Sequence, residues 1–365
     1  MKGLWLSCPE RITLVSVPHH DDRQEHIMVP TTSLGTTGPT VSRIGLGAMG
    51  MSGMYGRSED AESTATIHAA LDEGIDLIDT GDFYGSGHNE TLIGAALSGR
   101  RREDVTLSVK FGAMRGPGGR WGGVDNRPDS IRNFLAYSLQ RLGVDYIDIY
   151  RPARLDPSVP IEDTVGAIGE LVEAGYVRHI GLSEVGPETI RRAAAVHPIA
   201  DLQIEYSLIS RGIENEILPL CRELGIGVTA YGVLSRGLLS DSLRSNSALA
   251  PDDFRAYSPR FQGENLRQNL RLVDTMAELA AQHGVTVAQL AIAWVLAQGG
   301  DIVPVVGARK VTRLTETLGA LDVHLSAADL AGIAAAVPDS AVAGDRYAPA
   351  QMAQLDSERT TVGQS

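Results

Sequence analysis

The sequence predicts an α/β fold, a (β/α)₈ TIM barrel preceded by a short β-hairpin. Eight short apolar runs follow one another along the 365-residue chain. Most of these runs are continuous, as expected of parallel strands that are buried on both faces. Amphipathic helical stretches alternate with them, which is the order of parallel β/α units. Eight such units close into a barrel.

The elements follow in order along the chain. Residues 32–42 are expected to form the hairpin, with its turn at Thr-Thr-Gly-Pro. Helical stretches such as 61–74 and 161–175 place their apolar residues on one face and stop at a glycine. The eight barrel strands are expected within residues 43–49, 75–80, 105–112, 146–150, 177–184, 202–207, 226–232 and 302–308.

The same patterns divide the chain into three parts. Residues 1–31 form an N-terminal extension that is expected to be flexible, residues 32–340 form the barrel, and residues 341–365 form a polar C-terminal tail that is expected to be mobile. Within the barrel, residues 232–270 form a long irregular connection after the seventh strand. Loops of this length in a compact domain are usually functional or disordered.

The composition excludes several classes of function. A net charge of −13 and a pI of about 5.2 argue against nucleic acid or an anionic membrane surface as the partner, because both require a basic surface. No apolar run reaches the length of about 18 residues that is typical of a membrane-spanning helix. The oligomeric state is not readable from the sequence.

No metal site is expected. Cys8 and Cys221 are far apart and fit no zinc spacing. Two free thiols are typical of a reducing compartment, so a cytoplasmic location is predicted. The run HHDDRQEH, from His19 to His26, has no recognisable ligand spacing and is interpreted as a solvated part of the extension.

A candidate catalytic group follows the second and third strands, since active-site residues of such barrels come from the carboxyl ends of strands. Asp79 ends the second strand, Tyr84 follows in the loop, and Lys110 lies within the otherwise apolar third strand. A buried lysine is costly unless it is paired, and Asp79 is the expected partner. A lysine beside a phenol is expected to lower its pKa from about 10, making Tyr84 a usable general acid. The alternative is a structural ion pair that only fixes the barrel.

Three cations follow the eighth strand. Arg309, Lys310 and Arg313 fall at the start of a predicted helix, where the helix dipole favours anions. An anionic ligand would remove this conflict, and phosphate sites recur at the ends of the last strands of such barrels. A solvated basic face is the alternative.

The run GLGAMG, with Gly45, Gly47 and Gly50, has the spacing of a dinucleotide-binding fingerprint. That fingerprint also needs a helix directly after the glycines, whereas MSGMYGRS follows here. The run is therefore interpreted as a tight loop at the barrel mouth, where glycine allows a ligand to approach the backbone closely.

Taken together, these motifs resemble the aldo/keto reductase superfamily. DTGDFYGSGHNETLIGAAL is similar to its first signature, VPVVGARKVTRLTETLGAL to its last, and HIGLSEVGPETIRRAAAVHPIADLQIEYSLISR to its central region. The similarity spans residues 32–337. It implies a TIM barrel that reduces carbonyl groups with NADPH, in which Tyr84 donates the proton, Lys110 tunes it and Asp79 supports Lys110.

The same resemblance implies a cofactor site. Ser183 and Gln203 would hold the nicotinamide carboxamide, Tyr231 would stack on the nicotinamide ring, and Arg309 and Arg313 would contact the adenosine 2′-phosphate. The other implied positions line the mouth, follow the pyrophosphate or lie at the adenine end: Gly47, Ala48, Met49, Asp79, Gly232, Val233, Leu234, Arg236, Gly237, Leu238, Gly307, Glu316 and Thr317.

The sequence departs from the family pattern at three positions. Ala153 stands where the family usually has a histidine, and Glu184 and Thr317 each stand where it often has an asparagine. Loss of the histidine removes a hydrogen-bond donor that would orient the carbonyl. The small alanine is expected to enlarge a substrate pocket lined by Ala153, Arg154 and Tyr84.

The predicted function is that of an NADPH-dependent oxidoreductase that reduces an aldehyde or ketone, a small-molecule carbonyl substrate, with Tyr84 as proton donor. Arg151 and Arg154 flank Ala153, and whichever points inward could polarise the carbonyl or bind an anionic substrate. The alternative is a cofactor-binding regulatory or redox-sensing barrel with little or no turnover. Retention of all three candidate catalytic residues disfavours that alternative.

Overall fold

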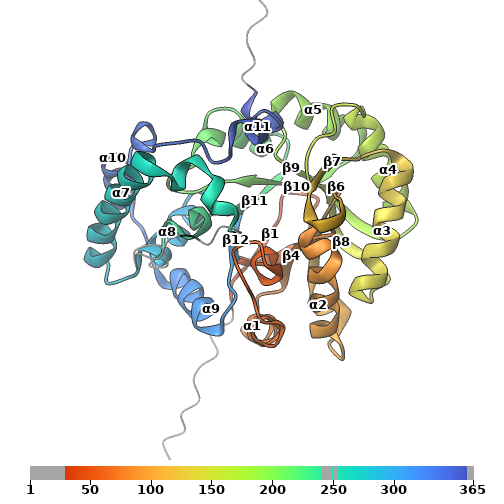
Figure 1. The fold of residues 1–365 in the computed structure, drawn as a ribbon, viewed down its shortest axis with the longest axis horizontal. Coiled ribbons are helices and arrows are strands. Elements are labelled where there is room, and N and C mark those ends of the chain that lie inside the picture. The colour runs from red at the N-terminus through yellow and green to blue at the C-terminus, as the bar shows by residue number, and fades with distance from the viewer. Residues whose placement is uncertain (1–28, 241–248, 250–252, 360–365) are drawn as a thin grey trace, which may run out of the picture.

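Eight parallel strands close into a barrel in the computed structural model, which describes residues 29–240, 249 and 253–359 (Figure 1). Each strand pairs with the next barrel strand along the chain, and the last pairs with the first. The barrel strands are β3 (Gly45–Gly47), β4 (Leu77–Gly81), β5 (Thr106–Phe111), β8 (Ile147–Pro152), β9 (Val177–Ser183), β10 (Ile199–Glu205), β11 (Gly227–Tyr231) and β12 (Ile302–Gly307). The predicted (β/α)₈ barrel is confirmed.

Helices surround the barrel (Figure 1). In α4, Val165, Ile168 and Leu171 are buried, which is the apolar face that the sequence predicts. The helices are α1 (Asp60–Asp72), α2 (His88–Leu97), α3 (Pro128–Leu142), α4 (Ile161–Glu173), α5 (Pro187–Val196), α6 (Ile217–Glu223), α7 (Gly263–Gln282), α8 (Val287–Leu296), α9 (Val311–Leu318), α10 (Ala327–Ala336) and α11 (Pro349–Met352).

The predicted N-terminal hairpin closes the end of the barrel where the strands begin. It consists of β1 (Thr31–Ser33) and β2 (Thr40–Ser42), which pair antiparallel. Leu34 and Val41 of the hairpin form a small apolar cluster with barrel residues. Gly35 has a φ of 68°, and a Cβ there would lie 2.6 Å from backbone atoms of the barrel floor. Only glycine fits this close approach.

Two loops differ from the sequence prediction. A second hairpin, β6 (Ala113–Arg115) with β7 (Trp121–Val124), follows β5. The irregular connection predicted over residues 232–270 ends earlier, because α7 begins at Gly263. Its polar opening, GENLRQN, hides the helical spacing of the apolar residues that follow. Residues 241–248 and 250–252 of this connection lie outside the described residues.

The two chain ends also differ from the predicted boundaries. Residues 341–359 pack on the barrel, and Arg346, Tyr347 and Leu355 are buried; in Figure 1 the blue segment after α10 crosses the barrel to α11. The expectation of a mobile tail is therefore wrong for these residues, because ion pairs and apolar contacts hold them. At the other end the folded chain starts by Val29, which is buried. The rest of the extension, with the run from 19 to 26, and residues 360–365 lie outside the described residues.

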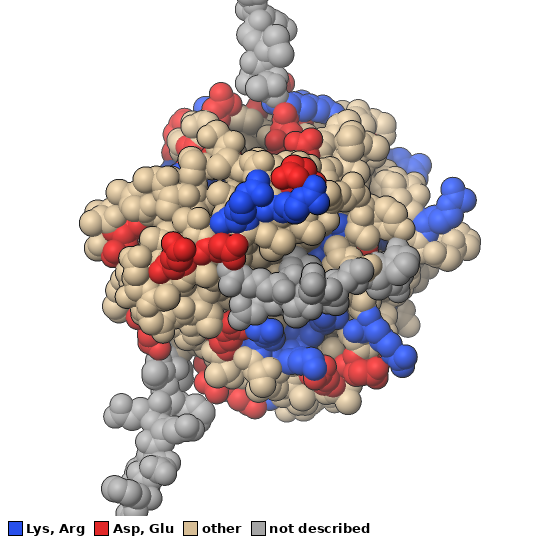
Figure 2. Space-filling model, turned by 60° about the vertical axis from the view of Figure 1, so that its left-hand side comes forward, with Lys and Arg blue, Asp and Glu red and all other residues tan. Residues whose placement is uncertain are grey.

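The described surface carries charges of both signs. Figure 2 shows Lys and Arg next to Asp and Glu over much of one face. Exposed ion pairs, such as Arg267 with Glu264 at 2.7 Å, occur among the described residues. No single helix among the described residues is long and apolar enough to cross a membrane; only α7 and α8 together, bent by 82°, reach that length and composition. The described residues contain no cluster of side chains suited to a metal ion.

Candidate active site

Asp79, Lys110 and Tyr84 lie together where β4 and β5 end. Asp79 pairs with Lys110 through one carboxylate oxygen. Its other oxygen accepts hydrogen bonds from Ser108 Oγ and Gln203 Nε2, both at 2.7 Å. Lys110 Nζ lies 5.2 Å from the centroid of the Tyr84 ring, and Tyr84 is only 6% exposed. An acid, an amine and a phenol thus share one buried site.

The pKa of Tyr84 differs from the sequence expectation. Burial raises it well above its ordinary value, and Asp79 raises it further. The expectation of a lowered pKa is therefore not met in this structure, because the free-energy cost of withdrawing the phenolate from water exceeds the stabilisation that nearby positive charge gives it. Burial also lowers the pKa of Lys110, while Asp79 opposes that shift. Tyr84 consequently remains a protonated phenol at neutral pH.

Two residues on β9 and β10 face the same end of the barrel. Ser183 ends β9 and stands in register with Gln203 on β10. The Ser183 hydroxyl is buried and has no hydrogen-bond partner among the described residues. Gln203 is bound to Asp79. A buried hydroxyl without a partner is rare in folded proteins and often indicates a place for a ligand or water.

The connection after β11 turns tightly through a 3₁₀ turn at Ser235–Gly237. Its backbone has a positive φ at Gly232, Ser235, Arg236 and Gly237, of 68°, 44°, 56° and 92° respectively. Ser235 provides a second buried hydroxyl that lacks a partner in the described part of the chain. The apolar residues of this loop are buried or partly buried: Val233, Leu234 and Leu238.

Two buried carboxylates, Glu184 and Glu205, organise the barrel mouth. Arg346 lies 2.6 Å from Glu184 and 3.5 Å from Glu205, and Arg236 lies 2.8 Å from Glu205. The Tyr231 hydroxyl donates to Glu184 at 2.7 Å. Burial acts to raise the pKa of both carboxyl groups, but the guanidinium groups outweigh it, so both pKa values fall below the ordinary value. Both carboxylates are therefore charged at neutral pH.

Sequence reasoning missed the importance of Glu205, Ser235 and Arg346. Glu205 carried a usable signal, because it stands two residues after Gln203 and residues two apart on a strand share a face. Arg346 carried none, since its partner Glu184 is 162 positions away in the sequence. This pair is one of several contacts that attach the C-terminal segment to the mouth.

The cations after β12 lie at the start of α9, as predicted, but each already has a partner. Arg309 donates to two backbone carbonyl groups in the loop before α1, at 3.2 and 3.1 Å. Lys310 lies 3.3 Å from a carboxylate of α1, and Arg313 lies 2.7 Å from Glu316. Thr317 donates its hydroxyl to the backbone of the same helix at 2.9 Å. These contacts leave both a phosphate site and a solvated basic face open as interpretations.

The glycine-rich run after β3 leads into a 3₁₀ turn at Met49–Ser52 and not into an α-helix, in agreement with the interpretation as a tight loop. Ala48 N donates to the backbone oxygen of Asp79 at 2.9 Å. Gly47 pairs with Gly307 of β12 across the closure of the barrel. This loop therefore borders the candidate catalytic group.

Arg151 and Arg154, which flank Ala153, lie in different surroundings. Arg151 is fully buried inside the barrel, 2.9 Å from Asp201. Arg154 lies at the mouth, where it donates to the backbone oxygen of Ala153 at 2.7 Å and lies 3.4 Å from the Tyr347 hydroxyl. Ala153 itself is only 1% exposed. The enlarged pocket expected from its small side chain therefore does not open at the surface, and Arg154 is the flanking cation that faces the site.

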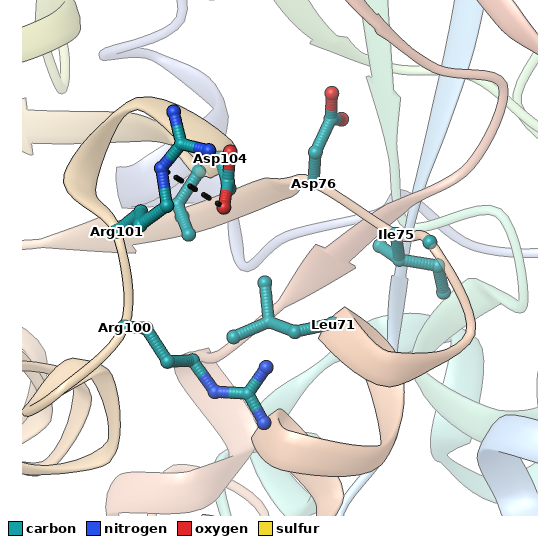
Figure 3. Close-up of a pocket in the computed structure, with 8 residues that line it drawn as sticks. Leu71, Ile75, Asp76, Arg100, Arg101 and Asp104 are labelled. Atoms are coloured by element: carbon teal, nitrogen blue, oxygen red, sulfur yellow. Dashed lines mark ion pairs between the residues drawn. The ribbon is translucent and has the colours of Figure 1, made fainter.

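Two cavities lie at the opposite end of the barrel. One of about 250 Å³ lies between the end of α1 and the start of β5, and Figure 3 shows Arg101 and Asp104 beside it, 3.9 Å apart. The other, of about 360 Å³, extends from there to the end of α3. Arg100 contributes to both but is paired with Asp72 at 2.8 Å. Catalytic groups of such barrels lie at the carboxyl ends of the strands, so these cavities are not part of the candidate site.

Comparison with known proteins decides the family. A model of the aldo/keto reductase family matches residues 43–338. The chain belongs to the aldo/keto reductase family. A probable aldo-keto reductase of Glycine max is 45% identical over 327 residues, which cover 87% of this chain and 92% of that protein. Members of the family are generally oxidoreductases that reduce carbonyl groups with nicotinamide cofactors, and the chain is an oxidoreductase of this family.

Solved structures of aldo/keto reductases share the fold. The glycerol dehydrogenase of Gluconobacter oxydans is 31% identical, with a TM-score of 0.76, and the match covers 85% of this chain and 96% of that one. An aldo-keto reductase of Bacillus halodurans, in its holo form, is 26% identical with a TM-score of 0.72, and the match covers 85% and 97% of the two chains.

The described residues of this aldo/keto reductase fit a nicotinamide cofactor in the mouth. The observation that favours the fit is the pair of buried hydroxyls, Ser183 Oγ and Ser235 Oγ, that lack partners in the described chain. A ligand with amide and phosphate oxygens would satisfy such groups. Gly232 and Gly237 adopt the left-handed backbone that lets a loop pass close to a ligand.

Proposed function

We propose that this chain reduces an aldehyde or ketone to an alcohol with NADPH and that Tyr84 is the proton donor. The observation that carries the proposal is the buried contact of Asp79, Lys110 and Tyr84 at the carboxyl ends of adjacent strands. A purely structural ion pair would account for Asp79 with Lys110, but it would not account for a buried phenol beside them.

The proposed proton transfer follows from the charges around Tyr84. Its raised pKa keeps the proton on the phenol until a carbonyl oxygen, gaining negative charge, accepts it. The phenolate left behind is stabilised by the Lys110 ammonium, whose Nζ lies 5.2 Å from the ring centroid. Asp79 holds Lys110 in place and is itself fixed by Ser108 and Gln203. NADPH supplies the hydride for the carbonyl carbon.

The proposed cofactor site runs along the mouth from β9 to α9. Ser183 and Gln203 would bind the carboxamide, Tyr231 would contact the nicotinamide ring, and the loop after β11 would follow the pyrophosphate. Arg309 and Arg313 would contact a 2′-phosphate, which favours NADPH over NADH because two guanidinium groups bind a phosphate dianion well.

The absence of histidine at position 153 limits the proposed rate. Loss of one donor to the developing oxyanion typically costs about 10²–10³ in rate. Tyr84 still supplies one hydrogen bond to the carbonyl oxygen, and Arg154 is a cation at the mouth whose charge acts on Tyr84. Turnover is therefore expected to be slow and not abolished. A small-molecule substrate and a cytoplasmic location belong to the same proposal.

The test is NADPH oxidation with a panel of aldehydes and ketones, in the unaltered protein and in Tyr84→Phe. Loss of a general acid lowers kcat by about 10²–10⁴, while NADPH binding should be retained. Tyr137→Phe is the matched control, because Tyr137 lies on the outer face of α3 and is 52% exposed. Tight NADPH binding without turnover of any carbonyl by the unaltered protein would instead favour the regulatory barrel.

A further inference from the structure

Two arginines near Tyr84 lack a carboxylate partner within the described chain, whereas most described arginines have one. Arg154 is partly buried, and among the described residues its guanidinium contacts a backbone oxygen at 2.7 Å and Tyr347, whose hydroxyl lies at 3.4 Å and whose ring centroid lies at 5.9 Å. Arg115, on β6, donates to a backbone oxygen of its own hairpin at 3.2 Å. Withdrawing a guanidinium from water without an anion is costly, so an anionic ligand would stabilise both.

Both arginines are close to the phenol. The guanidinium carbon of Arg115 lies 5.9 Å from the centroid of the Phe83 ring, and the Phe83 ring meets the Tyr84 ring edge-on at 4.7 Å. Arg154 follows Ala153, whose N–H donates at 2.8 Å to the backbone oxygen of the residue after Lys110. The charge of Arg154 also acts on Tyr84 and on Lys110.

The carboxylates of the site are already engaged. Asp79 is bound to Lys110, Ser108 and Gln203. Glu184 forms two contacts with Arg346, at 2.6 and 2.8 Å, and accepts a hydrogen bond from Tyr231. The charge of Glu184 acts on Arg154, but among the described residues neither Asp79 nor Glu184 forms an ion pair with Arg115 or Arg154. A closer pairing would cost a carboxylate one of its buried partners, which is strongly destabilising.

We propose that the substrate is a carbonyl compound with an anionic group, a carboxylate or a phosphate, that Arg115 and Arg154 bind while the carbonyl oxygen meets Tyr84. This inference rests on the proposed function. The same hairpin offers apolar surface for the remainder of the substrate, because Trp121 is 45% exposed and lies in register with Arg115. The guanidinium of Arg115 lies 5.7 Å from the Trp121 ring, so charge and apolar surface adjoin.

The test uses matched substrate pairs that differ in charge. 4-Carboxybenzaldehyde is compared with 4-methylbenzaldehyde, and glyceraldehyde 3-phosphate with glyceraldehyde, at saturating NADPH. The unaltered protein is expected to favour the anionic member of at least one pair by about tenfold to a hundredfold in kcat/KM, the range expected for hydrogen bonds to a charged group. Which pair shows the preference distinguishes a carboxylate from a phosphate.

Variants then assign the preference to the two arginines. In Arg154→Gln, in Arg115→Gln and in the double variant, the anionic-to-neutral ratio should fall towards one. The change should lie mainly in KM, because the anionic group is bound equally before and during the reaction. Arg154→Lys should restore part of the ratio. Arg120→Gln, an exposed arginine on the same hairpin, is the matched control and should leave the ratio unchanged.

Three results would overturn the inference. The first is an anionic-to-neutral ratio of kcat/KM near one in the unaltered protein, and the second is a ratio that the double variant leaves unchanged. The third is an equal loss of kcat on both members of a substrate pair in Arg154→Gln, which would mean that Arg154 polarises the carbonyl itself. Turnover of the neutral aldehydes alone tests the proposed function, so its failure is distinguishable. If nothing is turned over, the titration of benzoate into the unaltered protein and the double variant still decides whether the two arginines bind an anion.

Discussion

Asp82 is a largely buried carboxyl group, and replacing it by an uncharged side chain should stabilise the protein at neutral and alkaline pH. It lies two residues before Tyr84, between β4 and α2. One of its carboxylate oxygens has no hydrogen-bond partner in the described chain, and the other is 3.4 Å from Gly112 N. Burial raises the pKa of Asp82 to about 7, with Glu90 adding to the shift. The charged form is therefore poorly accommodated in the folded state.

The sign of the effect follows from the direction of this pKa shift. The folded state holds the Asp82 proton more tightly than the unfolded state, in which the pKa is close to 3.8. The free energy of unfolding is thus unaffected by this group below pH 4, decreases as the pH rises to 7, and is constant above that. At about 1.4 kcal/mol per pKa unit, the full penalty is about 4 kcal/mol, of which about 2–3 kcal/mol develops between pH 5 and pH 8.

Asp82→Asn keeps the size of the side chain and removes the charge. Urea titrations at pH 5, 6.5 and 8 should give the variant a relative gain in free energy of unfolding that grows by about 2–3 kcal/mol from pH 5 to pH 8. Asp145→Asn, at an exposed aspartate, should show the pH dependence of the unaltered protein. A gain of the same size at all three pH values, or a loss at pH 8, would refute the reasoning.

Three further predictions concern stability and reactivity. Arg346→Met should lower the free energy of unfolding by about 3–5 kcal/mol in urea titrations, because it leaves Glu184 buried without its cation. Gly94→Ala should cost about 1–3 kcal/mol, since its Cβ would lie 2.7 Å from carbonyl oxygens at the end of α3, whereas Gly332→Ala on α10 meets nothing within 4 Å and should be neutral or stabilising. In a variant that lacks Cys8, the Cys221 thiol should resist iodoacetamide at pH 8 until the chain unfolds, because it is buried and its pKa is raised to about 12.

The barrel could be predicted because its signal is local. Most strands are short apolar runs, and helices such as 161–173 have an apolar face and stop close to a glycine, so 43–49 and 161–175 could be assigned without knowing their neighbours. The hairpin at 113–124 could not, because its strands are short, rich in glycine and partly exposed. Its register comes from pairing across the loop, which leaves little periodicity in the sequence.

The candidate site could likewise be predicted only in part. Asp79, Tyr84 and Lys110 could be placed together because strand ends meet in a parallel barrel. Their electrostatics could not be predicted, since the sequence showed the cation beside the phenol but not how completely the phenol is withdrawn from water. The attachment of Arg346 was also out of reach, because an ion pair between distant positions leaves no local pattern.

The described chain ends emerge at opposite poles of the barrel. Val29 lies beside Gly74, at the pole that the N-terminal hairpin seals. The C-terminal segment crosses the catalytic pole, where Ser357 donates to Glu184 at 2.7 Å. If the protein is immobilised on a surface through a tag or linker ahead of Val29, its catalytic pole should therefore face the solution. Immobilisation through a tag after residue 359 would instead bring the surface close to the entrance of the candidate active site.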